Sequence, residues 1–277
     1  MPDYKTSRTA LATAYMRAAH QLFDAPPRIL DDQVALSLLG PAAVQRIKDT
    51  ADHYRTPDRL ALRAHVVLRS RFAEDRLAAA VLRGITQYVI LGAGFDTFAL
   101  RQPPWAQALK ILEVDHPGTQ AMKRSHLTAA GLAMPENAAF ANIDFEHESL
   151  PDGLRRYHVS MNEPTFFSWL GVMMYLKEDA IDAVLRSVAM FPAGSEIALT
   201  FAPPPGDFPP PFARRAASLG EPWVSYFEPD ALEAKLLGAG FFKVEFLSPA
   251  EAEARYFRQR PGDLPVPKRT NILSAVL

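Results

Sequence analysis

One stretch in the first half of the chain constrains the fold most. In residues 87–97, QYVILGAGFDT, five strand-forming residues run directly into a Gly-Ala-Gly turn. A short apolar run of this kind is typical of a buried parallel strand. Glycines after it let the backbone approach a ligand closely and adopt dihedrals that a side chain would disfavour. We therefore expect a central strand of an α/β sheet, followed by a ligand-binding turn that includes Gly92, Ala93, Gly94 and Asp96.

A second apolar run, residues 111–115, carries the acids Glu113 and Asp115. A carboxylate about twenty residues beyond a glycine turn can accept hydrogen bonds from both hydroxyls of a ribose. A dinucleotide fingerprint needs a third glycine, and Thr97 stands in its place. The shorter turn suits a ligand without phosphate, such as S-adenosylmethionine (SAM). The structural alternative is a plain β-turn before a helix, with both acids solvated at a strand end.

Several segments together carry a family resemblance: residues 87–101, 111–124, 143–146 and 164–176. With these motifs, in this order and spacing, the chain resembles the leucine carboxyl methyltransferase family, in its bacterial branch of SAM-dependent O-methyltransferases. The resemblance covers nearly the whole chain. It implies a class I methyltransferase fold, which is a doubly wound, mostly parallel, seven-stranded Rossmann-like sheet, here with an N-terminal helical cap. It also implies SAM as the cofactor.

The resemblance assigns further site residues. The family places an arginine for the SAM carboxylate in the long helix before the first strand, where Arg69 matches best and Arg71 second. An arginine fork can bind a carboxylate through two hydrogen bonds. The alternative is a solvated helix face on which these arginines pair with nearby acids. The family uses an acid and the next residue after the third strand for adenine, which correspond to Asp144 and Phe145.

One position departs from the family pattern. Many members carry an acid directly before the residue that corresponds to Gly171, and this chain has Leu170 there. In the family that acid belongs to the cofactor site, so one polar contact is absent or replaced.

Composition excludes several classes of protein. Thirty basic and 31 acidic residues nearly cancel without a basic stripe, so we expect no nucleic-acid partner. The absence of cysteine excludes disulfides and thiolate metal sites. His116 and His147 flank the predicted site acids, but no further ligand falls at a fixed spacing, so we expect no metal. No apolar run is long enough to span a bilayer and the N-terminus carries no hydrophobic signal region, which predicts a cytoplasmic protein without membrane contact.

The order of patterns predicts two parts. Residues 1–85 have helical periodicity and precede the first strand, so we expect them to form a helical cap over the strand ends. We expect residues 86–277 to form the SAM-binding core. Six prolines among residues 203–212 disfavour a helix or a central strand there, and we interpret residues from about 202 to 222 as a lid insertion over the substrate.

We expect a SAM-dependent methyltransferase that acts on a hydroxyl or carboxyl oxygen, with a small-molecule acceptor. The first alternative is an NAD(P)-dependent oxidoreductase, against which stand the missing third glycine and the absence of a Tyr-x-x-x-Lys pair after the fourth strand. The second is a non-catalytic SAM-binding protein, which Leu170 favours. No residue stands in a context that marks a catalytic base, so the catalytic residues stay unassigned.

Overall fold

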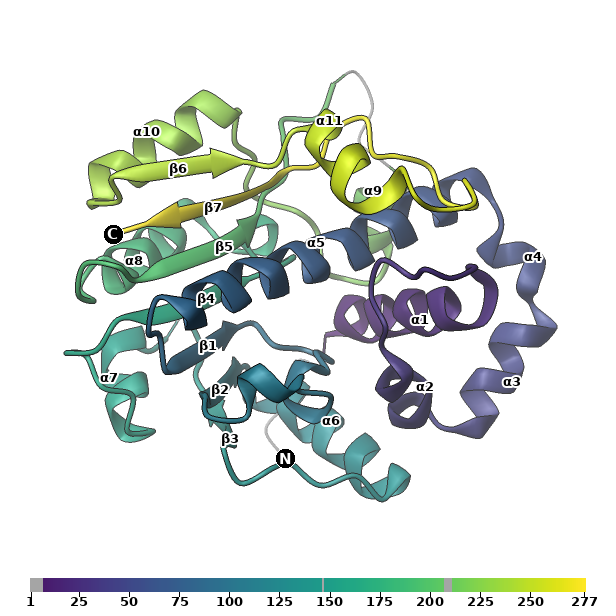
Figure 1. Ribbon diagram of the computed structural model, residues 1–277, viewed down its shortest axis with the longest axis horizontal. Coiled ribbons are helices and arrows are strands. Elements are labelled where there is room, and N and C mark those ends of the chain that lie inside the picture. The colour runs from purple at the N-terminus through teal and green to yellow at the C-terminus, as the bar shows by residue number, and fades with distance from the viewer. Residues whose placement is uncertain (1–6, 146, 207–210) are drawn as a thin grey trace.

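The computed structural model describes residues 7–145, 147–206 and 211–277, and it contains a seven-stranded sheet (Figure 1). The strand order is β3-β2-β1-β4-β5-β7-β6. The strands are β1 (Gln87–Leu91), β2 (Lys110–Asp115), β3 (Ala138–Asn142), β4 (Thr165–Trp169), β5 (Glu196–Thr200), β6 (Lys243–Phe246) and β7 (Ile272–Val276). Strands β1 to β5 pair in parallel, and β7 is antiparallel to both β5 and β6. The predicted class I methyltransferase fold is confirmed.

Helices cover both faces of the sheet, because the central strands are buried on both sides. In β1, Val89 and Leu91 join the core of one face, while Tyr88 and Ile90 join the core of the other. The first face packs against α7 (Leu150–Arg156), α8 (Glu178–Val188) and α10 (Pro229–Ala239). The second packs against α5 (Pro57–Leu82), α11 (Pro249–Ala252) and the π-helical turn η4 (Glu253–Phe257). Side chains alternate across a strand, so a fully apolar run supplies both layers.

The N-terminal helices form a separate cluster at the carboxyl ends of the strands. They are α1 (Arg8–Phe23), α2 (Gln33–Leu39), α3 (Pro41–Asp49) and α4 (Ala51–Tyr54). The hydrophobic core of this cluster also contains Phe95 and Leu127, and Leu127 belongs to α6 (Pro117–Ala130). The long helix α5 contacts α1 as well as the sheet, so it belongs to both layers (Figure 1). Residues 1–6 of the predicted cap lie outside the described residues.

The segment between β5 and α10 passes over the strand ends. It contains α9 (Pro211–Ser218), in which Pro211 occupies a first-turn position that suits proline. Backbone hydrogen bonds fix its later part, from Val224 N to Met174 O at 2.7 Å and from Phe227 N to Ala202 O at 2.8 Å. Met174 lies in the 3₁₀ turn η3 (Met173–Tyr175); two further 3₁₀ turns are η1 (Phe98–Leu100) and η2 (Pro104–Ala106). Residues 207–210 of the predicted lid lie outside the described residues.

Candidate functional site

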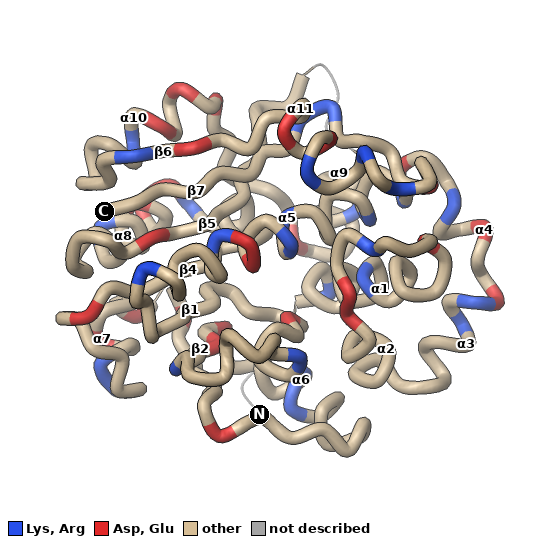
Figure 2. The backbone as a smooth tube through the Cα atoms, viewed as in Figure 1, with Lys and Arg blue, Asp and Glu red and all other residues tan. Residues whose placement is uncertain are grey.

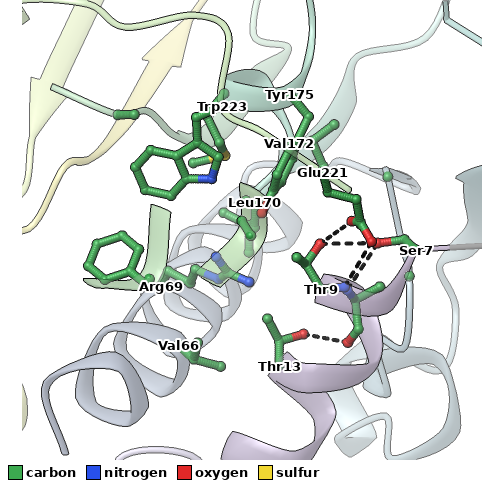
Figure 3. Close-up of a pocket in the computed structure, with 18 of the residues that line it drawn as sticks. Ser7, Thr9, Thr13, Val66, Arg69, Leu170, Val172, Tyr175, Glu221 and Trp223 are labelled. Carbon is green, nitrogen blue, oxygen red and sulfur yellow. Dashed lines mark hydrogen bonds between the residues drawn. The ribbon is translucent and has the colours of Figure 1, made fainter. Parts of the chain in front are cut away.

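A cavity of about 1010 Å³ opens at the carboxyl ends of β1, β2 and β4. Ligands of open α/β sheets bind at this edge, and the volume lies at the upper end of the usual range for ligand pockets, about 300–1,000 Å³. Its walls come from α1, α5, the loops after β1 to β5, α9 and the loop before β7. Figure 3 shows part of this lining, with Arg69 and Val66 on one wall and Ser7, Thr9 and Thr13 on the other.

The glycine turn after β1 forms one wall of the cavity. Gly92 has φ +67° and Gly94 has φ +50°, a region that L side chains rarely adopt. A Cβ at Gly92 would overlap the side chain of Val172, and one at Gly94 would lie 3.0 Å from Cβ of Ala10. Ala93 N donates to Val114 O at 3.0 Å, which joins the turn to β2. The positive φ angles agree with the dihedrals expected from the sequence, and close packing against Val172 and Ala10 also favours glycine at both positions.

Asp115 ends β2 and lines the cavity beside this turn. Its Oδ2 accepts a hydrogen bond from Gly94 N and its Oδ1 accepts one from His116 N at 2.7 Å. Burial raises the pKa of this carboxyl, although these backbone donors act in the opposite direction. The two backbone donors fix the orientation of the carboxylate at the cavity wall.

Asp96 and Glu113, both predicted to bind the cofactor, differ in position. Asp96 lines the cavity, and its Oδ1 accepts a hydrogen bond from Phe98 N at 2.7 Å. Glu113 is not part of the described cavity lining: its carboxylate is fully buried and pairs with Lys123. Burial raises the pKa of Glu113 to about 7, against the lowering by Lys123. The structure thus separates the two acids of β2: Asp115, the last residue of the strand, lines the described cavity, whereas Glu113 lies in the strand interior.

Asp144 and Phe145 follow β3 and both line the cavity. Oδ2 of Asp144 lies 2.9 Å from Nδ1 of His147 and 3.7 Å from Nε2 of His116. Phe145 is half-buried and packs against the core of the sheet. The structure thus brings this pair to the same cavity as the glycine turn and Asp115.

Arg69 projects from α5 into the cavity and lies against Gly171 (Figure 3). A Cβ on Gly171 would lie 2.9 Å from Cζ of Arg69 and closer still to one guanidinium nitrogen. No carboxylate in the described part of the chain forms an ion pair with Arg69. Burial lowers its pKa to about 10, which leaves it charged at neutral pH. Arg71, by contrast, pairs with Asp75 at 2.8 Å on an exposed face.

Leu170 lines the cavity directly before Gly171, at the place where family members often carry an acid. It is partly buried and packs against the core on the α5 side of the sheet. An apolar surface therefore stands at this point of the cavity.

Sequence reasoning missed several lining residues that come from distant parts of the chain. Glu221, in the segment after α9, accepts hydrogen bonds from Ser7 Oγ at 2.9 Å and from Arg8 N at 2.6 Å, and also from N and Oγ1 of Thr9 (Figure 3). The sequence separation of more than two hundred residues gave no signal for this contact.

His65 and Trp223 also line the cavity. His65 stands one helical turn before Arg69, and burial together with the charge of Arg69 lowers its pKa to about 3. Trp223 packs edge-on against Phe212, with ring centroids 5.1 Å apart. Its indole Nε1 is buried and has no hydrogen-bond partner in the described structure.

Within the described ranges, no group of three or more His, Cys, Asp or Glu side chains is arranged to hold a metal ion. No helix in this part of the chain is both long and apolar enough to cross a bilayer.

Comparisons with known proteins agree with this geometry. A family model described as leucine carboxyl methyltransferase matches residues 10–189. The Bacillus subtilis (strain 168) protein "Putative S-adenosyl-L-methionine-dependent methyltransferase YktD" is 30% identical over 100% of this chain and 99% of its own length. A Mycobacterium marinum protein with the same description is 30% identical over 77% of this chain and 72% of its own length.

Two solved structures share the fold. A DUF574 family protein from Streptomyces avermitilis aligns with a TM-score of 0.58 and 18% identity, over 99% of this chain and 98% of that one. A structure titled as a putative methyltransferase from Thermobifida fusca aligns with a TM-score of 0.56 and 20% identity, over 87% of this chain and 91% of that one. The resemblance seen in the sequence is confirmed, and the chain belongs to the leucine carboxyl methyltransferase family.

Proposed function

We propose that the protein transfers the methyl group of SAM to an oxygen atom of a small acceptor molecule. The observation that carries this proposal is the placement of Asp115 and Arg69 in one cavity, with the glycine turn as a further wall. A guanidinium that forms no ion pair in the described structure, in a cavity that the glycine turn also lines, fits the zwitterionic methionine part of SAM. The names of the relatives support the same cofactor.

The cofactor half of the cavity consists of the glycine turn, Asp115, Asp144 and Phe145, with Arg69 at its far end. Asp115 would accept the ribose hydroxyls through lone pairs that Gly94 N and His116 N leave available. Asp144 and Phe145 would hold the adenine. Arg69 would bind the carboxylate through its guanidinium fork. Glu113 has no place in this assignment, because Lys123 and the interior of the protein enclose its carboxylate.

The remaining space is the acceptor half. Its lining is largely apolar and comes from α5, α9 and the segment that follows α9; its members include Leu62, His65, Val66, Phe212, Leu219 and Trp223. A mostly apolar chamber with few polar groups fits an organic molecule with an apolar body. The buried Nε1 of Trp223 and the imidazole of His65 are polar groups available to orient it.

The choice between carboxyl and hydroxyl acceptors depends on a base. SAM, when bound, supplies an electrophilic methyl group on a sulfonium, and the protein must align the acceptor and exclude water. A hydroxyl acceptor needs proton removal, whereas a carboxylate does not. In the described lining of the acceptor half, His65 is a weak base because its pKa is lowered to about 3, and the carboxylate of Glu221 is occupied by hydrogen bonds from α1. These two observations favour a carboxylate acceptor.

The test is methyl transfer from tritiated SAM to a small-molecule extract of bacterial cells. Methyl esters release volatile methanol in mild base and methyl ethers do not, so base-labile volatile label is the expected result. Label that stays bound in base would assign a hydroxyl acceptor instead. Binding of S-adenosylhomocysteine (SAH) without any transfer would point to a non-catalytic SAM-binding protein. Arg69→Met, which removes the guanidinium, is the matched variant and should lose most of the transfer.

A further inference from the structure

Two buried cationic side chains bind the backbone carbonyls of the loop that follows the glycine turn. Nη2 of Arg17, from α1, donates to the carbonyl oxygen of Phe95. Nζ of Lys123, from α6, donates to the carbonyl oxygen of the next residue, Asp96, at 2.6 Å. The side chains of Arg17 and Lys123 are only 7% and 1% exposed. Two successive carbonyls of a cavity-lining loop are therefore each bound by a cation from a different helix.

Each cation is itself fixed by a buried carboxylate. Nε of Arg17 lies 2.8 Å from Oδ2 of Asp32, and the same oxygen accepts a hydrogen bond from Thr97 Oγ1 at 2.8 Å. Lys123 pairs with Glu113, and the two side chains are 1% and 0% exposed. A charge-assisted hydrogen bond in a low-dielectric interior is stronger and more directional than one in water, and breaking a buried pair leaves an uncompensated charge. The loop conformation from Phe95 to Thr97 is thus tied to α1, to the start of α2 and to α6.

We infer that Lys123 and Arg17 are positioning residues for the cofactor. They fix the conformation of the loop that contains Phe95 and Asp96, which lines the cavity with Asp115 and Arg69. This inference rests on the proposed function. Lys123 is not in the described cavity lining, so it acts on a ligand only through Asp96 and the loop. Arg17 also lines the cavity, and its hydrogen bond to the Phe95 carbonyl connects helix α1 of the cap to the loop. The cap is on this view part of the cofactor site and not only a cover.

The structure offers a matched control. Arg63 is a buried arginine of α5 whose guanidinium binds Asp24 and the Tyr54 carbonyl, each at 2.7 Å, and it touches no part of the loop. Its side chain is 1% exposed and that of Asp24 is 2% exposed. Arg63→Met therefore breaks a buried ion pair as Lys123→Met does, with a comparable loss of stability and without a contact to the loop.

The experiment is calorimetric titration of full-length variants with SAH, each at the same interval below its own melting temperature. Lys123→Met should raise the Kd for SAH by about tenfold or more, since the loop loses a charge-assisted hydrogen bond. Arg63→Met should stay within about threefold of the wild type, the level of weak coupling between distant sites. Arg17→Met should weaken SAH as Lys123→Met does, and Arg17→Lys, which keeps a cation near Phe95 O, should restore most of the affinity.

Equal affinities for Lys123→Met and the wild type, or equal losses in Lys123→Met and Arg63→Met, would overturn the inference. If Lys123→Met does not fold, Arg17→Met against Arg63→Met makes the same comparison. A wild-type protein that does not bind SAH at all would refute the proposed function, and the positioning role with it. Wild-type binding with unaffected variants would refute only the positioning role.

Discussion

Gly171 lies so close to Arg69 that a Cβ at this glycine would be 2.9 Å from the guanidinium carbon of the arginine. Gly171 also has φ +78°, and its N–H donates to Thr200 Oγ1 at 2.7 Å. The glycine after β4 thus leaves the space in which Arg69 reaches the cavity. Leu170, directly before it, supplies apolar surface and no competing charge.

Gly171→Ala should displace the guanidinium of Arg69 and weaken SAH by about tenfold, the loss expected for one charge-assisted contact. It should leave the affinity for 5′-methylthioadenosine nearly unchanged, because that compound lacks the carboxylate. Calorimetry with both compounds checks this. Gly131→Ala is the matched control, since Gly131 has φ +64° but nothing within 4 Å of an added Cβ. Equal effects of the two substitutions on SAH would show that backbone strain, and not Arg69, is responsible.

Asp115→Asn should weaken both SAH and 5′-methylthioadenosine by about tenfold or more, because both carry the ribose and a hydrogen bond to a charged group contributes roughly 1.5–3 kcal/mol. Asp144→Asn should cost less, since the proposed site assigns Asp144 to the adenine and its side chain is partly exposed. The same two titrations measure these effects. Unchanged affinity of folded Asp115→Asn for both compounds would rule out the ribose assignment.

Glu221 caps the first turn of α1, whose leading N–H groups have no partner within the helix. Glu221→Gln should therefore raise the hydrogen-exchange rates of the Arg8 and Thr9 amides by about tenfold or more, as the charge-assisted bonds are lost. Nuclear magnetic resonance exchange measurements on these two amides test the expectation. Glu228→Gln is the control, because Glu228 precedes α10 without a side-chain cap hydrogen bond. Unaltered exchange rates in Glu221→Gln would mean that the Glu221 carboxylate does not stabilise the first turn of α1.

Glu113 should make stability depend on pH. Burial raises its pKa in the folded protein to about 7, above the ordinary glutamate value of 4.5. Between these values the folded state binds the proton and the unfolded state does not, so the contribution of Glu113 to stability falls as pH rises from about 4.5 to 7. The slope is at most about 1.4 kcal/mol per pH unit.

The measurement is the difference in unfolding free energy between the wild type and Glu113→Gln from pH 5 to pH 8. The unfolding free energy of the wild type relative to that of the variant should fall as pH rises to about 7, and should stay constant above that pH. Glu196→Gln, which alters another fully buried glutamate paired with Arg76 and Arg83, is the control. A difference that does not change with pH, or that shifts in favour of the wild type, would contradict the raised pKa of Glu113.

Much of the fold could be predicted because the central strands β1, β4 and β5 are short, mostly apolar and fully buried runs. Helix α7 was not predicted: Pro151 and Gly153 lie inside its seven residues and weaken the helical pattern. Gly153 packs against Ile143, a contact between neighbouring elements that the local sequence does not reveal.

The candidate site, like the fold, could be predicted from the sequence only in part. Gly92 and Gly94 follow β1, Asp115 is the last residue of β2 and Asp144 follows β3, so their positions at one sheet edge could be predicted from the strand pattern. The contacts of Glu221 with α1 and of Arg17 with Phe95 join distant segments and depend on tertiary packing. The burial of Glu113 could not be predicted, because a carboxylate inside a strand and one at its end look alike in sequence, and its partner Lys123 lies ten residues further on, within α6.

The most direct test of the central claim is calorimetric titration of the wild-type protein with SAH and, separately, with NAD. The expected result is saturable binding of SAH with one site per chain and no heat of binding with NAD. Binding of NAD alone would contradict the methyltransferase assignment, and binding of neither compound would contradict the proposed cofactor site built on Asp115 and Arg69.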